Sequence, residues 1–428
     1  MSDTNTASPS ILAPLKLRPF RLLFGGQVFT DLSNWLDFTA LTVLLVYVWQ
    51  HGPEAIAALM ITVGIPWVFI GPLVSVWVDR LPRRPLMIYL VLAKLLVTAG
   101  FLFAPNLYVL LPLIFLRGVL GVMLVPARQG AIRSIVPEQL LPGAVTLGEL
   151  STRLTQVLAP VLGGVIVAYS SPQVVFGVEL VILIIAAIFL MRLPRLQNEP
   201  NRENREKTSF WAEFGEGLQH IRSRRILAMA ILLLGVGFFM IFLYDGMLAL
   251  WAKGIGLGES SYGLLMSAIG FGNIVGAIVA GQFAFWRKNP LQFIVIAAVF
   301  LGLINILIGF GGLGHVVTHV SLWVLTFLVF GVVGAAATVP FGYILQTETP
   351  NHLMGRVSGV ASAISNGSML AAPAIGAALA KFIGVGGVFA AAGALMTLIA
   401  LCVLVVLPRL VAGHKPLVQP DGESASVS

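Results

Sequence analysis

The sequence predicts an all-α membrane protein with twelve transmembrane helices, arranged as two six-helix bundles. Hydrophobic residues make up 58% of the 428 residues and charged residues only 10%, and the mean hydropathy is +0.95, far above that of a water-soluble domain. Apolar runs of about 20 residues, enough to cross a bilayer, recur along the chain. Each must be helical, because a helix satisfies its own backbone hydrogen bonds in hydrocarbon.

A polar segment separates six predicted spans from another six. The first six cover residues 20–47, 54–78, 85–104, 106–126, 144–169 and 172–192. The second six cover residues 226–251, 260–285, 290–311, 320–345, 356–381 and 384–407. The expected organisation is an N-terminal tail (1–19), a first bundle (20–192), a linker (193–225), a second bundle (226–407) and a C-terminal tail (408–428).

The positions of lysine and arginine predict the orientation. If both termini lie on one side, only Lys253 and Lys381 among the loop cations fall on the other side. Basic loops stay in the cytoplasm, so both termini are expected to be cytoplasmic. The net charge of +8 therefore reflects topology and contact with anionic lipid, and no nucleic-acid partner is expected.

The linker begins as a charged stretch and continues as an amphipathic one. Its apolar residues recur at helical spacing: Phe210, Trp211, Phe214, Leu218 and Ile221. We expect a flexible tether followed by a helix on the cytoplasmic membrane surface.

The two halves repeat each other at a shift of 213 residues, which superimposes Gly118 on Gly331 and Pro160 on Pro373. This indicates a duplication and two related bundles. The stretch "GFGNIVGAIVAG" (270–281) places small residues at every fourth position, a pattern that permits close packing of helices.

Three sequence motifs lie in the first half of the chain. "SVWVDRLPRRP" (75–85) joins spans 2 and 3, "RGVLG" (117–121) lies in span 4, and "LAPVLGG" (158–164) lies in span 5. They resemble, in turn, the loop signature and two antiporter signatures of the major facilitator superfamily. The chain is most similar to its macrolide-efflux and enterobactin-exporter group of drug:proton antiporters, and the resemblance covers nearly the whole chain.

The resemblance implies roles for residues in the first and third motifs. Gating is expected of the loop residues and of a cation at the start of span 11: Asp79, Arg80, Arg83, Arg84 and Arg356. Asp79 can pair with Arg356 as a latch, although the arginines also serve topology alone. A helix bend is expected at Ala159, Pro160, Gly163 and Gly164, because proline removes a backbone hydrogen bond.

Ionisable residues inside spans mark the candidate site, because a charge at the bilayer centre costs about 2.5–3.5 kcal/mol. The expected proton- and substrate-binding residues are Asp31, Asn34, Asp37, Arg117, Glu149 and Arg153. Asp31, level with Arg117 by depth, is the expected charge partner, and Asp37 the expected proton acceptor. Glu149 and Arg153 either bind substrate or neutralise each other. Lys94, Glu179 and Asp245 rank behind these.

The predicted function is secondary active export of an amphipathic or hydrophobic organic solute, either a drug-like compound or a siderophore-like metabolite, by proton antiport with alternating access. A lipid (lysophospholipid) or metal-ion transporter is the alternative. No nucleotide-phosphate loop or enzyme motif occurs, so neither ATP drive nor an enzyme is expected. We expect no cofactor and no bound metal, a monomer in contact with membrane lipids, and a multi-pass location in the cell membrane.

Overall fold

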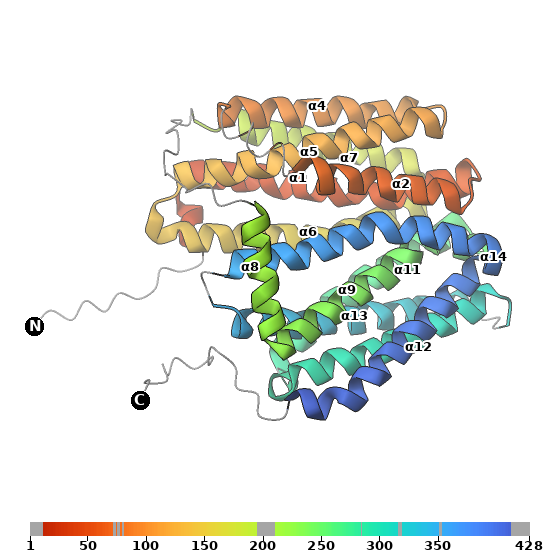
Figure 1. Ribbon diagram of the computed structural model, residues 1–428. Coiled ribbons are helices and arrows are strands. Elements are labelled where there is room, and N and C mark those ends of the chain that lie inside the picture. The colour runs from red at the N-terminus through yellow and green to blue at the C-terminus, as the bar shows by residue number, and fades with distance from the viewer. Residues whose placement is uncertain are drawn as a thin grey trace, which may run out of the picture. The chain divides into compact units, whose positions relative to one another are not determined.

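The computed structural model describes residues 12–71, 74, 78, 81–194, 210–283, 285–315, 319–350 and 353–411, and this part of the chain is built from helices (Figure 1). Ten of the described helices are long and apolar enough to cross a membrane, which confirms an all-helical, multi-pass membrane protein. Contacts divide the chain into two compact units. The first is Met1–Leu44 with Ile65–Arg202, and the second is Leu45–Gly64 with Glu203–Ser428.

The first unit is organised around α1 (Arg18–Val43). Its other described helices are η1 (Ala13–Lys16), η3 (Pro66–Ile70), α4 (Arg83–Phe103), α5 (Leu107–Ile135), η4 (Glu138–Leu140), α6 (Leu141–Tyr169) and α7 (Pro172–Met191). α1 packs along both α6 and α7, while α4 packs along α5 and α7. α1 is not one of the ten apolar helices, because it carries several polar residues. Its packing against α6 and α7 buries those polar residues within the unit.

The third motif lies where α6 approaches α1. Ala159, Gly163 and Gly164 are buried, and a Cβ at Gly163 would come within 2.9 Å of the carbonyl oxygen of Leu36. Pro160 lies inside α6, which continues to Tyr169. The glycine therefore serves close contact between two helices that both carry polar side chains.

The second unit holds α2 (Pro53–Ile65) and the helices from residue 210 onward. The α-helices among these are α8 (Phe210–Ser223), α9 (Arg225–Tyr244), α10 (Leu248–Gly254), α11 (Glu259–Phe283), α12 (Pro290–Gly312), α13 (Val320–Glu348) and α14 (Met354–Val411). Gly384 interrupts α14 with a φ of 72°, a conformation that glycine adopts without steric cost. The two arms of α14 correspond to the predicted spans 356–381 and 384–407.

The small-residue stripe 270–281 lies at the contact of α11 with α13. A Cβ at Gly272 would collide with the carbonyl oxygen of Leu328, and one at Gly276 with the carbonyl oxygen of Val332. The predicted close packing is confirmed.

The amphipathic part of the linker is helical, as predicted, while its charged part lies outside the described residues. α8 packs on α14 and α9 (Figure 1), and a hydrogen bond joins it to the end of α13. Glu216 forms an ion pair with Arg356, the Nε2–H of His220 donates to the carbonyl oxygen of Glu348 at 2.9 Å, and Ile221 is buried. One face of α8 is thus held by protein contacts.

Candidate functional site

A cluster of charged side chains lies inside the first unit, on α1, α4, α5 and α7. Arg117 of α5 contacts Asp37 Oδ2 of α1 at 2.8 Å and also forms an ion pair with Glu179 of α7. Ser33, one turn from Asp37 on α1, donates its hydroxyl to Glu179 Oε1 at 2.8 Å. One guanidinium therefore holds two carboxylates from two helices.

Lys94 of α4 completes this cluster. Its ammonium donates to Asn34 Oδ1 at 2.6 Å, and the whole residue is 0% exposed. Glu179 is 0% exposed as well, and Asp37 only 3%. Burying unpaired charges would cost several kcal/mol each. The negative charges of two acids and the positive charges of two bases offset one another. This allows four ionisable groups to be buried on membrane-spanning helices.

The cluster has spare hydrogen-bonding capacity. Glu179 Oε2 and Arg117 Nε are buried and have no hydrogen-bond partner among the described residues. Orphaned polar atoms of this kind are rare in native interiors and call for an explanation. A water molecule or a polar group of a solute would satisfy them, because Arg117 Nε–H needs an acceptor and Glu179 Oε2 needs a donor.

Asp31 belongs to a different network from Asp37. Arg128 of α5 contacts Asp31 Oδ1 at 2.7 Å. The other oxygen accepts hydrogen bonds from Gln27 at 3.3 Å, Ser151 at 3.3 Å and Thr152 at 3.1 Å. The expected pairing of Asp31 with Arg117 is wrong, because six residues along a helix rotate a side chain by about 120° toward another neighbour. Asp31 is saturated with donors, whereas the Asp37 cluster is not.

The remaining predicted binding residues, Glu149 and Arg153 of α6, are exposed. No ion pair joins them to each other or to any other described residue. The structure does not bring them to the cluster, and the hypothesis that they neutralise each other is wrong.

The expected gating residues are spread over both units. Asp79 and Arg80 lie outside the described residues. Arg83 donates to the carbonyl oxygen of Gly130 at 2.8 Å, and Arg84 donates to that of Met191 at 2.7 Å. Arg356 forms an ion pair with Glu216 of the linker helix, whereas Asp79 is its partner in the predicted latch.

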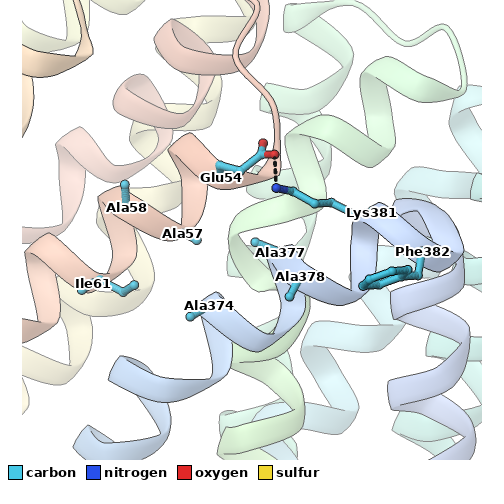
Figure 2. A pocket seen from close by; sticks show the side chains of 9 residues that line it. All are labelled: Glu54, Ala57, Ala58, Ile61, Ala374, Ala377, Ala378, Lys381 and Phe382. Atoms are coloured by element: carbon cyan, nitrogen blue, oxygen red, sulfur yellow. Dashed lines mark ion pairs between the residues drawn. The ribbon is translucent and has the colours of Figure 1, made fainter.

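A cavity of about 370 Å³ lies in the second unit, between α2 and α14 (Figure 2). Alanine side chains from both helices line it, with Ile61 and Phe382. Glu54 and Lys381 meet across one end at 3.0 Å. Both of these side chains are more than half exposed, so the cavity is apolar with a weak ionic contact at its rim.

Lys94 and Glu179 rank behind the other ionisable residues in the prediction from sequence, although their depth in the helices is a signal. Lys94 is the twelfth residue of α4 and Glu179 the eighth of α7, too far from the helix ends for a short side chain such as that of Glu179 to reach water. Glu179 and Lys94 belong to the same cluster as Asp37 and Arg117.

Comparison with known proteins identifies the family. The model of the Major Facilitator Superfamily matches residues 23–373. The MFS-type transporter YfiS of Bacillus subtilis is 25% identical, over 90% of this chain and 92% of the relative. The enterobactin exporter EntS of Citrobacter koseri is 27% identical, over 96% of this chain and 97% of the relative.

Solved transporter structures share the fold. A POT family transporter superimposes with a TM-score of 0.67 at 14% identity, over 92% of this chain and 97% of that one. The nucleoside transporter NupG gives a TM-score of 0.65 at 12% identity, over 94% and 100%. The helical architecture, the buried charges of the first unit and the match of the family model all point the same way: the chain belongs to the Major Facilitator Superfamily of membrane transporters.

Proposed function

We propose that this transporter exports an amphipathic or hydrophobic organic solute by proton antiport. The single observation that carries the proposal is the cluster of Asp37, Glu179, Arg117 and Lys94. A membrane helix retains buried ionisable residues at a cost, and such residues mark proton and substrate pathways. The cluster exchanges one proton during the transport cycle.

The chemistry of the cluster supports coupling. Desolvation disfavours each charged form, while a neighbouring opposite charge favours it, and the balance of the two lets a proton bind and leave. A solute that binds the proton-free cluster more tightly than the protonated one expels the proton. Competition of solute and proton for one site, with alternating access to the two sides, is antiport.

The direction and the solute class rest on the relatives and on the apolar lining. EntS is named for export of enterobactin, and it aligns with nearly the whole of this chain. The alanine-lined cavity between α2 and α14 offers an apolar surface to a solute or to a lipid chain. These features favour a drug-like or siderophore-like amphipathic solute.

The test begins with a thermal-stabilisation screen of the purified full-length protein against rhodamine 6G, erythromycin, enterobactin and a lysophospholipid. Transport of each stabilising compound is then followed in proteoliposomes with and without an imposed pH gradient. We expect uptake against the solute gradient only when the pH gradient is present, and its loss when a protonophore collapses that gradient. Transport that ignores the gradient contradicts antiport, and transport restricted to the lysophospholipid establishes the lipid alternative instead.

A further inference from the structure

Lys94 differs from the other three charged members of the cluster in what it touches. Asp37, Arg117 and Glu179 contact oppositely charged groups. The Lys94 ammonium contacts the amide oxygen of Asn34 at 2.6 Å, and within the described ranges it forms no ion pair. A fully buried ammonium thus rests on a neutral acceptor.

The charges around Lys94 come from each helix that packs on α4. α5 presents Arg117 and α7 presents Glu179, while α1 presents Asp37 and Asp31. Arg117 repels an ammonium at Lys94, and the three carboxylates attract it. Asp37 and Glu179 form their ion pairs with the Arg117 guanidinium. They therefore attract Lys94 without contacting it directly.

The protonation state of Lys94 sets the net charge of the cluster. A guanidinium keeps its proton throughout the physiological range, and that of Arg117 contacts both Asp37 and Glu179. With Lys94 protonated, the two acids and two bases sum to zero. With Lys94 neutral, the cluster carries one negative charge.

We propose that Lys94 is the residue that carries the exchangeable proton of this cluster. The inference rests on the proposed antiport function and assigns its proton to a residue. In the step itself, one N–H bond of the ammonium breaks, its electron pair stays on Nζ, and the proton passes to water. The reverse step restores the neutral cluster. Asn34 is a positioning residue, because its amide oxygen accepts a hydrogen bond from either form of Lys94 without fixing the charge.

Three substitutions separate a proton carrier from a structural charge. Lys94→Arg keeps a permanent positive charge, Lys94→Gln has none, and Lys94→His supplies a different exchangeable base. With rhodamine 6G as the probe in proteoliposomes, we expect Lys94→Arg and Lys94→Gln to lose at least about 10-fold of gradient-driven uptake. Lys94→His retains gradient-driven uptake, with its pH profile displaced to lower pH because imidazole is the weaker base. Thermal denaturation of each purified variant verifies folding.

A fourth variant leaves Lys94 in place. Asn34→Asp gives the ammonium a carboxylate partner, which stabilises the charged form. We expect the pH profile of gradient-driven uptake to move to higher pH, without loss of the folded protein.

The outcomes distinguish this inference from the proposed function. Wild-type uptake that ignores the pH gradient overturns antiport and the role of Lys94 together. If the wild type is coupled and Lys94→Arg or Lys94→Gln remains equally coupled, antiport stands and the role of Lys94 is wrong. An unchanged pH profile in both Lys94→His and Asn34→Asp also overturns it.

Discussion

The guanidinium of Arg117 contacts the carboxylate of Asp37 at 2.8 Å, inside the first unit and away from the helix ends. The same guanidinium holds Glu179, so α5 is tied through one side chain to both α1 and α7. Arg117 is therefore a structural centre of the unit as well as a member of the candidate proton site. A substitution of Arg117 therefore affects both stability and transport. Only the effect on transport depends on a proton gradient.

Arg117→Leu is expected to destabilise the protein by about 3–5 kcal/mol, because it leaves two buried carboxylates without their cation. Arg153→Leu is the matched control. Arg153 is exposed and forms no ion pair with a described residue, so its loss changes stability by less than about 0.5 kcal/mol. Thermal denaturation in detergent micelles compares the two. Equal stability of both variants contradicts the assigned contacts of Arg117.

Asp31→Asn is expected to cost about 3 kcal/mol of stability while leaving proton coupling intact. The substitution breaks a buried pair with Arg128, and an uncompensated buried charge is costly. Replacing both partners, as in Asp31→Leu with Arg128→Met, removes the unpaired charge and should recover part of the loss. Denaturation midpoints of the single and double variants measure this. If the double variant loses at least as much stability as Asp31→Leu and Arg128→Met lose in total when made singly, the pair is contradicted.

The contrast between Asp31 and Asp37 shows which features the sequence could predict. The polar face of α1 and the burial of both acids follow from residue type and helical spacing. The partners do not, because depth along the membrane normal leaves rotation about the helix axis undetermined. The predicted span 4 ended at residue 126, where the apolar run ends, but α5 continues to Ile135. That extension turns Arg128 from an expected loop residue into the partner of Asp31.

The contacts of the linker were also beyond sequence reasoning. Its amphipathic pattern predicts a helix with one apolar face, and such a face fits a membrane surface or a protein surface equally well. Ile221 packs in a core of the second unit, and Arg356, which the first motif suggested as a latch partner, is held by Glu216. Neither contact has a local signal, since each joins segments far apart in the chain.

Close packing of α11 on α13 predicts sensitivity to a single methyl group. Gly276→Ala places a Cβ against the carbonyl group of Val332, where backbone must move, and should cost about 1–3 kcal/mol. Gly281→Ala is the control on the same helix, because no described residue outside its own stretch of helix lies within 4 Å of the added Cβ. Denaturation midpoints of the two variants are compared. A control that loses as much stability as Gly276→Ala rules out the proposed clash.

The ion pair of Glu54 with Lys381 is expected to contribute little to stability. The two side chains meet at 3.0 Å (Figure 2). Both are more than half exposed, and exposed pairs contribute under about 1 kcal/mol. Glu54→Gln should therefore shift the denaturation midpoint only slightly, and the shift should shrink further in high salt. A loss above about 2 kcal/mol would show that the pair is desolvated.

Docking of α8 predicts protection of its backbone amides. Glu216→Gln combined with His220→Ala removes the contacts to Arg356 and to the carbonyl group of Glu348. Hydrogen exchange over residues 210–223 should become faster, because local opening then costs less free energy. Arg222→Gln is the control, since Arg222 is exposed. Unchanged exchange in the double variant contradicts docking through these contacts.

The most direct test of the central claim compares Asp37→Asn with Asp31→Asn in one transport assay. Both variants neutralise a buried aspartate of α1, but only Asp37 belongs to the cluster with Arg117, Glu179 and Lys94. Proton flux and rhodamine 6G flux are measured together in proteoliposomes under an imposed pH gradient. The account predicts that Asp37→Asn loses proton-coupled transport whereas Asp31→Asn keeps it. Normal coupling in Asp37→Asn would contradict the cluster as the proton site.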